Sequence, residues 1–133
     1  HGANAAAARI LRQGVCTSAS VIVNTPWLDE AVAILKEHPE VSIGVHLTLN
    51  AEWREYRWGP VSPYSEVRSL VDEDGRFFSS QQKFLANHPR TEEAERELRA
   101  QIELARRKGL PIAYLDCHMG TATCTPELRQ VVE

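Results

Sequence analysis

Residues 41–50 limit the possible folds of this chain more than any other segment. Their odd positions are all apolar: Val41, Ile43, Val45, Leu47 and Leu49. The even positions carry small or polar side chains, among them Gly44 and His46. Because successive side chains of a β-strand point to opposite faces, this alternation predicts a strand with one apolar packing face and one face of small and polar residues.

Helix and strand signals alternate along the rest of the chain. Strands are also predicted over residues 15–23 and 112–118, where β-branched and apolar side chains are frequent. Helices are predicted over residues 4–12, 26–37 and 91–108, and from residue 126 onward. Thr25-Pro26 and Thr125-Pro126 each predict a threonine N-cap followed by proline at the first helical position.

The helix that begins at Thr91 has the clearest signals. Acidic residues dominate its first turn and basic residues its last, as the helix dipole favours. Three pairs of opposite charge are spaced four residues apart: Glu92/Arg96, Glu95/Arg99 and Glu103/Arg107. Such pairs are typical of a solvated helix face, so these charges receive no functional role.

The order of the elements predicts the fold class. Helices that alternate with strands are typical of α/β proteins with a parallel sheet. We therefore expect a parallel (β/α) barrel-like fold that is incomplete in this chain, with about three strands and their flanking helices. Residues 1–133 are expected to form a single domain. An aromatic-rich loop at about residues 50–80 decorates it, with a small hairpin around Asp74-Gly75.

Composition excludes several classes of partner. The 15 basic and 18 acidic residues give a net charge of −3, so nucleic acid is not an expected partner. No apolar stretch approaches the ~20 residues needed to cross a bilayer, so a membrane is not expected either. The 3 cysteines include no C-x-x-C pair and fit free thiols in a reducing compartment. We therefore expect a cytoplasmic location.

Two histidines occupy corresponding positions at the ends of predicted strands. His46 and His118 lie where parallel α/β proteins build their sites, and Asp116 shares a strand face with His118. Imidazole is a good ligand for zinc and other first-row metals, but two histidines are short of the three protein ligands typical of catalytic zinc. Asp116 could be the third ligand, a partner that orients an imidazole, or a general base. Alternatively, each histidine is an ordinary core or loop residue with a satisfied hydrogen bond.

The loop after the second strand is rich in aromatic and basic side chains. They are Trp53, Tyr56, Trp58 and Tyr64, with Arg54 and Arg57. They could form a platform on which sugar rings stack, or a satellite hydrophobic cluster beneath a long loop. Cys117 is expected to be an inert buried thiol, since it points away from the face that carries His118.

Three segments in this order resemble the YdjC-like carbohydrate deacetylases, the family of chitooligosaccharide deacetylase. They are Gly44-Val45-His46-Leu47-Thr48-Leu49-Asn50, the stretch from Ser69 to Phe77, and Leu115-Asp116-Cys117-His118. The resemblance implies a distorted (β/α) barrel and a hydrolase of carbohydrate metabolism. That enzyme removes acetyl groups from N-acetylated amino sugars or oligosaccharides with a divalent metal, magnesium or zinc.

The resemblance also implies roles for individual residues. His46 and His118 match the two metal-binding histidines of the family, and Asp116 is a weaker catalytic candidate. The candidates for contact with the sugar are Thr48, Asn50, Trp53 and Arg54. The family's strand that ends in two adjacent aspartates, one a metal ligand and the other the base, is expected before residue 1. This chain is therefore expected to be the central portion of a longer enzyme and to be inactive alone.

Other functions stay open beside the deacetylase. The chain could be a non-catalytic carbohydrate-binding or assembly domain that keeps the cleft without the base. It could also belong to a metal-dependent hydrolase of another amide or ester, because the histidines limit the metal chemistry more than the substrate. The open edges of a partial parallel sheet make a homo-oligomer a further expectation.

Overall fold

The computed structural model describes residues 2–133, so His1 lies outside the described residues. The α-helices and strands are α1 (Gly2–Arg12), β1 (Ser18–Val21), α2 (Leu28–Lys36), β2 (Ser42–Leu47), α3 (Gln81–Ala86), α4 (Thr91–Arg107), β3 (Ile112–Cys117) and α5 (Pro126–Val132). Three short 3-10 segments are η1 (Tyr64–Glu66), η2 (Arg68–Leu70) and η3 (His118–Thr123). No helix in this described range is long and apolar enough to cross a membrane.

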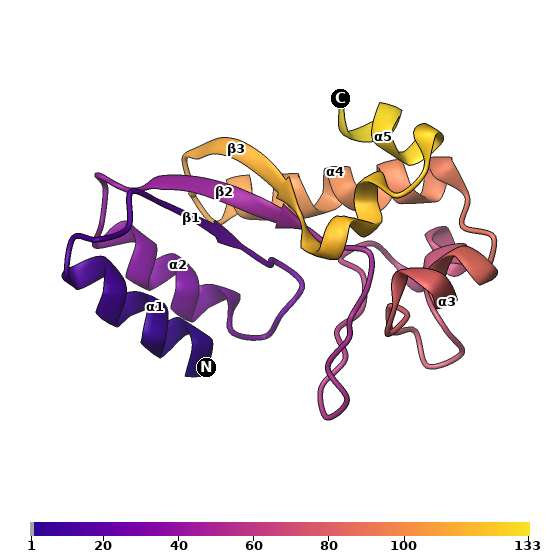
Figure 1. Ribbon diagram of the computed structural model, residues 1–133, viewed down its shortest axis with the longest axis horizontal. Coiled ribbons are helices and arrows are strands. Elements are labelled where there is room, and N and C mark those ends of the chain that lie inside the picture. Colours follow the sequence, from indigo (N-terminus) through magenta and orange to yellow (C-terminus); the bar gives the residue numbers. More distant parts are fainter. Residues whose placement is uncertain (1) are drawn as a thin grey trace.

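The three strands form one parallel sheet in the order β1-β2-β3. Helices α1 and α2 lie side by side below the sheet in Figure 1, and α4 runs beside β2 and β3. Each pair of neighbouring strands is joined by a crossover that contains a helix, which parallel pairing requires. The structure therefore confirms the α/β class and the three parallel strands.

The alternation in residues 41–50 divides the two faces of β2 as expected. Every odd position is at most 5% exposed, so this face belongs to the core. The core continues into α4 through Leu98 and Ala105, which lie on its buried stripe. Burial of this apolar face is the main contribution of β2 to stability. The even face, which carries His46, is not part of this apolar core and can carry polar groups.

Gly44 leaves room for an aromatic ring on that even face. Gly44 of β2 and Tyr114 of β3 are register partners. A Cβ atom at Gly44 would lie only 2.3 Å from Cε2 of the Tyr114 ring. The absence of a side chain at position 44 therefore allows the tyrosine ring to lie directly against Gly44.

The Gly44→Ala variant is expected to lose about 1–3 kcal/mol of unfolding free energy, because the tyrosine ring must leave its position. Urea denaturation of the complete protein measures this loss. The Gly44→Ala/Tyr114→Ala double variant should lose less than the sum of the two single variants, because the added methyl group then meets empty space. Additive losses would show that the ring does not limit position 44.

The start of α2 differs from the sequence expectation. Thr25 is not the N-cap, since α2 begins only at Leu28 and Trp27 precedes it without a side-chain cap. The Thr25 hydroxyl instead donates to the carbonyl of Ile22, and a turn joins the Leu28 N–H to the Thr25 carbonyl. The second Thr-Pro prediction is correct, because the Thr125 hydroxyl accepts from the Leu128 N–H at the start of α5. Identical dipeptides therefore act differently when a turn competes with the helix.

The charges on α4 form only one of the three predicted pairs. Arg99 and Glu95 are 2.8 Å apart, as expected. Arg96 instead contacts Glu66, and Glu103 pairs with Arg106, three residues away. All these side chains are at least 45% exposed, so exchanging partners costs little free energy.

Residues 48–80 contain no α-helix or β-strand, and a small hairpin lies within them. Val71 and Phe77 form the antiparallel bridge of that hairpin, and Gly75 turns the chain with a φ of 71°. Partial burial of Asp72 opposes its ionisation. The Arg76 backbone N–H and the Arg57 guanidinium outweigh this and hold the pKa of the carboxyl below its usual value. Helix α3, which follows directly, carries no clear sequence signal because it has only 6 residues.

Candidate functional site

The two histidines predicted from the strand ends do meet. His46 lies one residue before the end of β2, and His118 follows the last residue of β3. Nε2 of His46 is 3.2 Å from Nδ1 of His118, and the two rings meet edge to face. Parallel strands that end at the same edge of the sheet explain this convergence.

A carboxylate binds the far side of each histidine ring. Oδ1 of Asp116, the register partner of His46, is 2.9 Å from Nδ1 of His46. Oε2 of Glu52 is 2.7 Å from Nε2 of His118. The four side chains form one continuous row, Asp116–His46–His118–Glu52. Ser20 of β1 extends it by donating its hydroxyl to Oδ2 of Asp116 at 2.9 Å.

The row favours one arrangement of protons on the two rings. An ionised carboxylate only accepts hydrogen bonds, so Nδ1 of His46 and Nε2 of His118 are the donors. A neutral imidazole has only one N–H group, which leaves a lone pair on each of the two facing nitrogens. Two facing lone pairs 3.2 Å apart repel each other, and either a proton on one nitrogen or a metal ion between them removes this repulsion. The arrangement is therefore suited to binding a positive ion.

The described residues supply two of the ligand atoms that such an ion needs, Nε2 of His46 and Nδ1 of His118. Within residues 2–133, no three or more His, Cys, Asp or Glu side chains are grouped to hold a metal together. Both oxygens of Asp116 are occupied, one by His46 and the other by Ser20. This placement favours the orienting role among the three considered for Asp116. Its catalytic role stays a prediction.

The thiol beside this row is poorly suited to nucleophilic chemistry. Burial raises the pKa of Cys117, and the neighbouring Asp116 carboxylate raises it further. A thiol with a raised pKa holds little thiolate, which is the reactive form. This agrees with the expectation that Cys117 is inert.

The aromatic residues of the loop divide into buried and exposed members. Trp58 is 4% exposed, and its ring centroid is 5.7 Å from that of His118. Trp53 is 57% exposed and packs against Trp58 at 6.4 Å. The Tyr56 ring packs against Trp27 and not against the histidines. The guanidinium of Arg68 lies over the Tyr64 ring. Trp58 thus belongs to a buried cluster beside His118, while the Trp53 ring is exposed and its role in sugar stacking stays a prediction.

The four predicted sugar contacts divide in the same way. Thr48 and Asn50 are fully buried. The Thr48 hydroxyl donates to the Asn50 carbonyl, and the Asn50 side chain accepts from the Thr121 hydroxyl at 2.8 Å. These polar groups thus form hydrogen bonds within the protein, and the bond to Thr121 connects Asn50 to η3, which begins with His118. Trp53 and Arg54 are exposed.

Three residues of this region have no counterpart in the sequence prediction: Glu52, Glu97 and Gln101. The alternation of residues 41–50, extended by one further step beyond Asn50, would have placed Glu52 on the same face as His46. Glu97 and Gln101 lie on α4 among charges that resemble a solvated face, although both are fully buried. Only their positions beside Ala94, Leu98 and Ala105 on the apolar stripe could have indicated this.

Glu97 and Gln101 fasten the aromatic loop to the helix. Glu97 accepts four hydrogen bonds, from Asn24, Gln101 and the backbone N–H groups of Val61 and Ser62. Gln101 accepts from the Thr48 N–H at 3.0 Å and donates to the Thr48 carbonyl at 2.8 Å. The loop that carries Trp58 is therefore held on both sides by one turn of α4.

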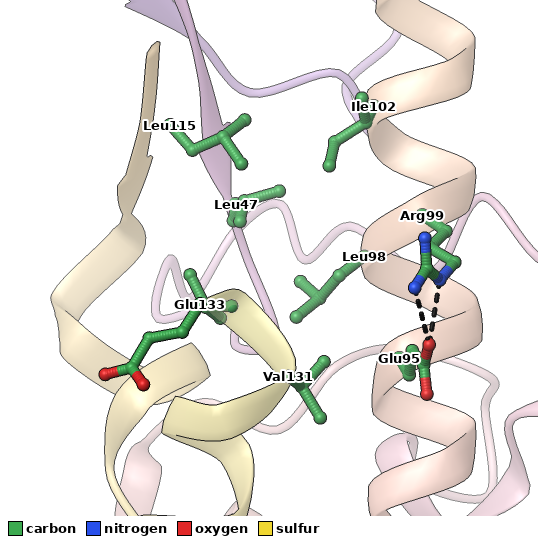
Figure 2. A pocket seen from close by; sticks show the side chains of 9 residues that line it. Leu47, Glu95, Leu98, Arg99, Ile102, Leu115, Val131 and Glu133 are labelled. Carbon is green, nitrogen blue, oxygen red and sulfur yellow. Dashed lines mark hydrogen bonds and ion pairs between the residues drawn. The ribbon is translucent and has the colours of Figure 1, made fainter.

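A cavity of about 240 Å³ lies on the other face of the sheet from the histidines. Figure 2 shows its lining between α4, α5 and the strands, with the Glu95–Arg99 ion pair at one side. Leu47 and Leu115 line it, and these residues alternate with His46 and Asp116 along their strands. The cavity is therefore separate from the candidate site.

Comparison with known proteins gives the same family from sequence and from structure. The model of the family described as "YdjC-like protein" matches residues 1–133. The carbohydrate deacetylase of Brevibacillus brevis is 38% identical over 88% of this chain and 43% of its own length. Carbohydrate deacetylase 1 of Listeria innocua is 37% identical over 80% of this chain and 41% of its own length.

A solved structure from Enterococcus faecalis V583, described as a cellobiose-phosphate cleavage protein, superposes with a TM-score of 0.84 at 29% sequence identity. The match covers 96% of this chain and 47% of that one. The chain thus spans less than half the length of each of these three proteins. The three strands and their helices match part of the barrel-like fold of this family.

Proposed function

Because the chain belongs to the YdjC-like protein family, we propose that the complete protein is a metal-dependent hydrolase that removes acetyl groups from N-acetylated amino sugars. The relatives from Brevibacillus brevis and Listeria innocua are named carbohydrate deacetylases, which supports an enzyme of that general kind. One observation of the structure carries the metal dependence. The facing nitrogens of His46 and His118 lie 3.2 Å apart, while both outer nitrogens are bound to carboxylates.

That spacing fits a shared divalent ion. Two nitrogens that bind one zinc ion at its usual distance and tetrahedral angle lie about 3.4 Å apart. In the proposal, His46 and His118 would hold zinc or magnesium, and Asp116 would orient the His46 ring. A divalent ion supplies Lewis-acid chemistry, in that it polarises the acetamide carbonyl and lowers the pKa of a water molecule.

The remaining parts of the site come from the family resemblance. Two imidazoles are one ligand short of the usual three, so the proposal takes the third ligand and the base from the family's aspartate pair. The side chains of this chain then have three tasks. His46 and His118 provide two ligands, Trp58 packs against His118, and Trp53 offers an exposed surface to the sugar.

The decisive test is acetate release from acetylated chito-oligosaccharides by the complete protein, with added Mg²⁺ or Zn²⁺ and with a chelator. We expect release that depends on the metal. The substrate panel should include other amides and esters and a phosphorylated disaccharide, since the Enterococcus relative is described as a cellobiose-phosphate cleavage protein. Sugar binding by calorimetry without acetate release would favour the carbohydrate-binding alternative.

The Trp53→Ala variant of the complete enzyme is expected to raise KM for acetylated chito-oligosaccharides by about 10-fold with little change in kcat. Loss of stacking removes binding that the ground state and the transition state share. Trp53→Phe should recover most of the affinity, because it keeps an aromatic face. Steady-state kinetics with a series of substrate concentrations measures both constants. An unchanged KM in Trp53→Ala would contradict the stacking role.

The proposal also includes a cytoplasmic location and self-association of the 133-residue chain. Cys16, Cys117 and Cys124 are all free thiols, which supports a reducing compartment. In the described range, β1 and β3 are the outer strands of the sheet, and unpaired strand edges favour association.

A further inference from the structure

We propose that Glu52 is a positioning residue that selects the ring orientation of His118 and so makes Nδ1, rather than Nε2, the nitrogen that binds the metal. This inference rests on the proposed function and concerns a residue that neither the motif nor the resemblance singled out. Its basis is the 2.7 Å contact between Oε2 of Glu52 and Nε2 of His118, the shortest in the row of four side chains.

Packing alone does not select the orientation of this ring. The His118 side chain is 12% exposed and lies against Trp58. An imidazole rotated by 180° about its bond to Cβ has almost the same shape, but it carries carbon atoms where its nitrogens were. Such a rotation would point carbon instead of Nδ1 toward His46. Only polar partners distinguish the two orientations. His46 faces Nδ1 at 3.2 Å, whereas Glu52 holds Nε2 at 2.7 Å and is the charged partner of this ring.

Glu52 also selects the proton position. As an acceptor it requires the proton on Nε2, which leaves the lone pair on Nδ1 directed at His46. Asp116 does the same for His46 from the opposite end, through Nδ1. The two histidines are therefore prepared as ligands of opposite type, one through Nε2 and the other through Nδ1. Carboxylates in such positions raise the metal affinity of the histidines that they orient.

The position of Glu52 is itself well defined. The Ala51 N–H donates to the Phe78 carbonyl at 2.9 Å, which fixes the backbone just before Glu52. Ala51 is fully buried. The Glu52 side chain is 30% exposed, so it is not part of the hydrophobic core. Substitution of Glu52 can therefore change the histidine without unfolding the loop.

Calorimetric titration of the metal-free complete protein with Zn²⁺ tests the proposal without any measurement of activity. Glu52→Ala is expected to weaken Zn²⁺ binding by about 10- to 100-fold. Glu52→Gln keeps an acceptor oxygen for Nε2–H and should recover most of the affinity. Glu55→Ala, an exposed glutamate in the same loop, is the matched control and should bind as wild type does. Thermal unfolding of each metal-free variant checks that the fold is retained.

Three results would overturn the inference in different ways. Wild-type affinity in Glu52→Ala would show that Glu52 does not position His118. An equal loss in Glu52→Gln and Glu52→Ala would indicate that the charge of Glu52 matters and not its acceptor role. A complete wild-type protein that binds no Zn²⁺ or Mg²⁺ would contradict the proposed function and this inference together.

Discussion

The His46→Ala variant of the complete protein is expected to lose both metal affinity and acetate release by more than about 100-fold. It removes a ligand, so its effect should exceed the about 10- to 100-fold loss typical of a residue that only orients a ligand. It also leaves Nδ1 of His118 without the facing nitrogen 3.2 Å away and frees Oδ1 of Asp116. Calorimetry with Zn²⁺ and an acetate-release assay measure the two losses separately.

His38→Ala is the matched control for this variant. His38 is also a largely buried histidine, with 13% of its side chain exposed, but it pairs with Glu40 at the turn before β2. Its replacement should leave metal binding and acetate release at the wild-type level. If His46→Ala bound Zn²⁺ as His38→Ala does, the histidine pair would not be the metal site.

The Glu97→Ala variant is expected to lower the unfolding free energy by about 3 kcal/mol or more. Four donors, including the backbone N–H groups of Val61 and Ser62, would lose their acceptor in a fully buried position. A buried donor without a partner costs about 1–3 kcal/mol. Urea denaturation of the complete protein measures the loss. Trp58 should become more exposed as the loop loosens, and its fluorescence would report this.

Two further variants make this prediction decisive. Glu97→Gln keeps the shape of the side chain but replaces one acceptor by an NH₂ group, so it should be intermediate in stability and remain folded. Glu103→Ala removes an exposed glutamate of the same helix whose partner is Arg106, and a change of no more than about 0.5 kcal/mol is expected. Equal stabilities of Glu97→Ala and Glu103→Ala would contradict the role of Glu97.

Local patterns were sufficient to predict the sheet and the histidine pair. The alternation in residues 41–50 indicated both the core face of β2 and the face of His46. The strand-end rule then brought His118 to His46, because parallel strands place their carboxyl ends together. These predictions depend on side-chain direction along one strand, which the sequence records directly.

The supporting contacts could not be predicted in this way. Glu52 meets His118 across 66 residues, and Glu97 meets Ser62 across 35. Only its position on the apolar stripe of α4 separates Glu97, which is fully buried, from Glu103, which is exposed, and this position does not identify the partners of Glu97. Long-range packing decides which charge on an amphipathic helix is buried. The Thr25-Pro26 prediction failed for a related reason, since a turn used the threonine before the helix could.

The attachment of the aromatic loop makes part of it suitable for exchange. Two anchors bound the first part of this loop: the Ala51 N–H donates to the Phe78 carbonyl, and Arg57 donates to the Asp72 carboxylate and the Phe77 carbonyl. Residues 53–55 between these anchors are exposed. If the proposed function holds, residues grafted at 53–55 are expected to change sugar preference, while the anchors on both sides keep the histidine pair in place.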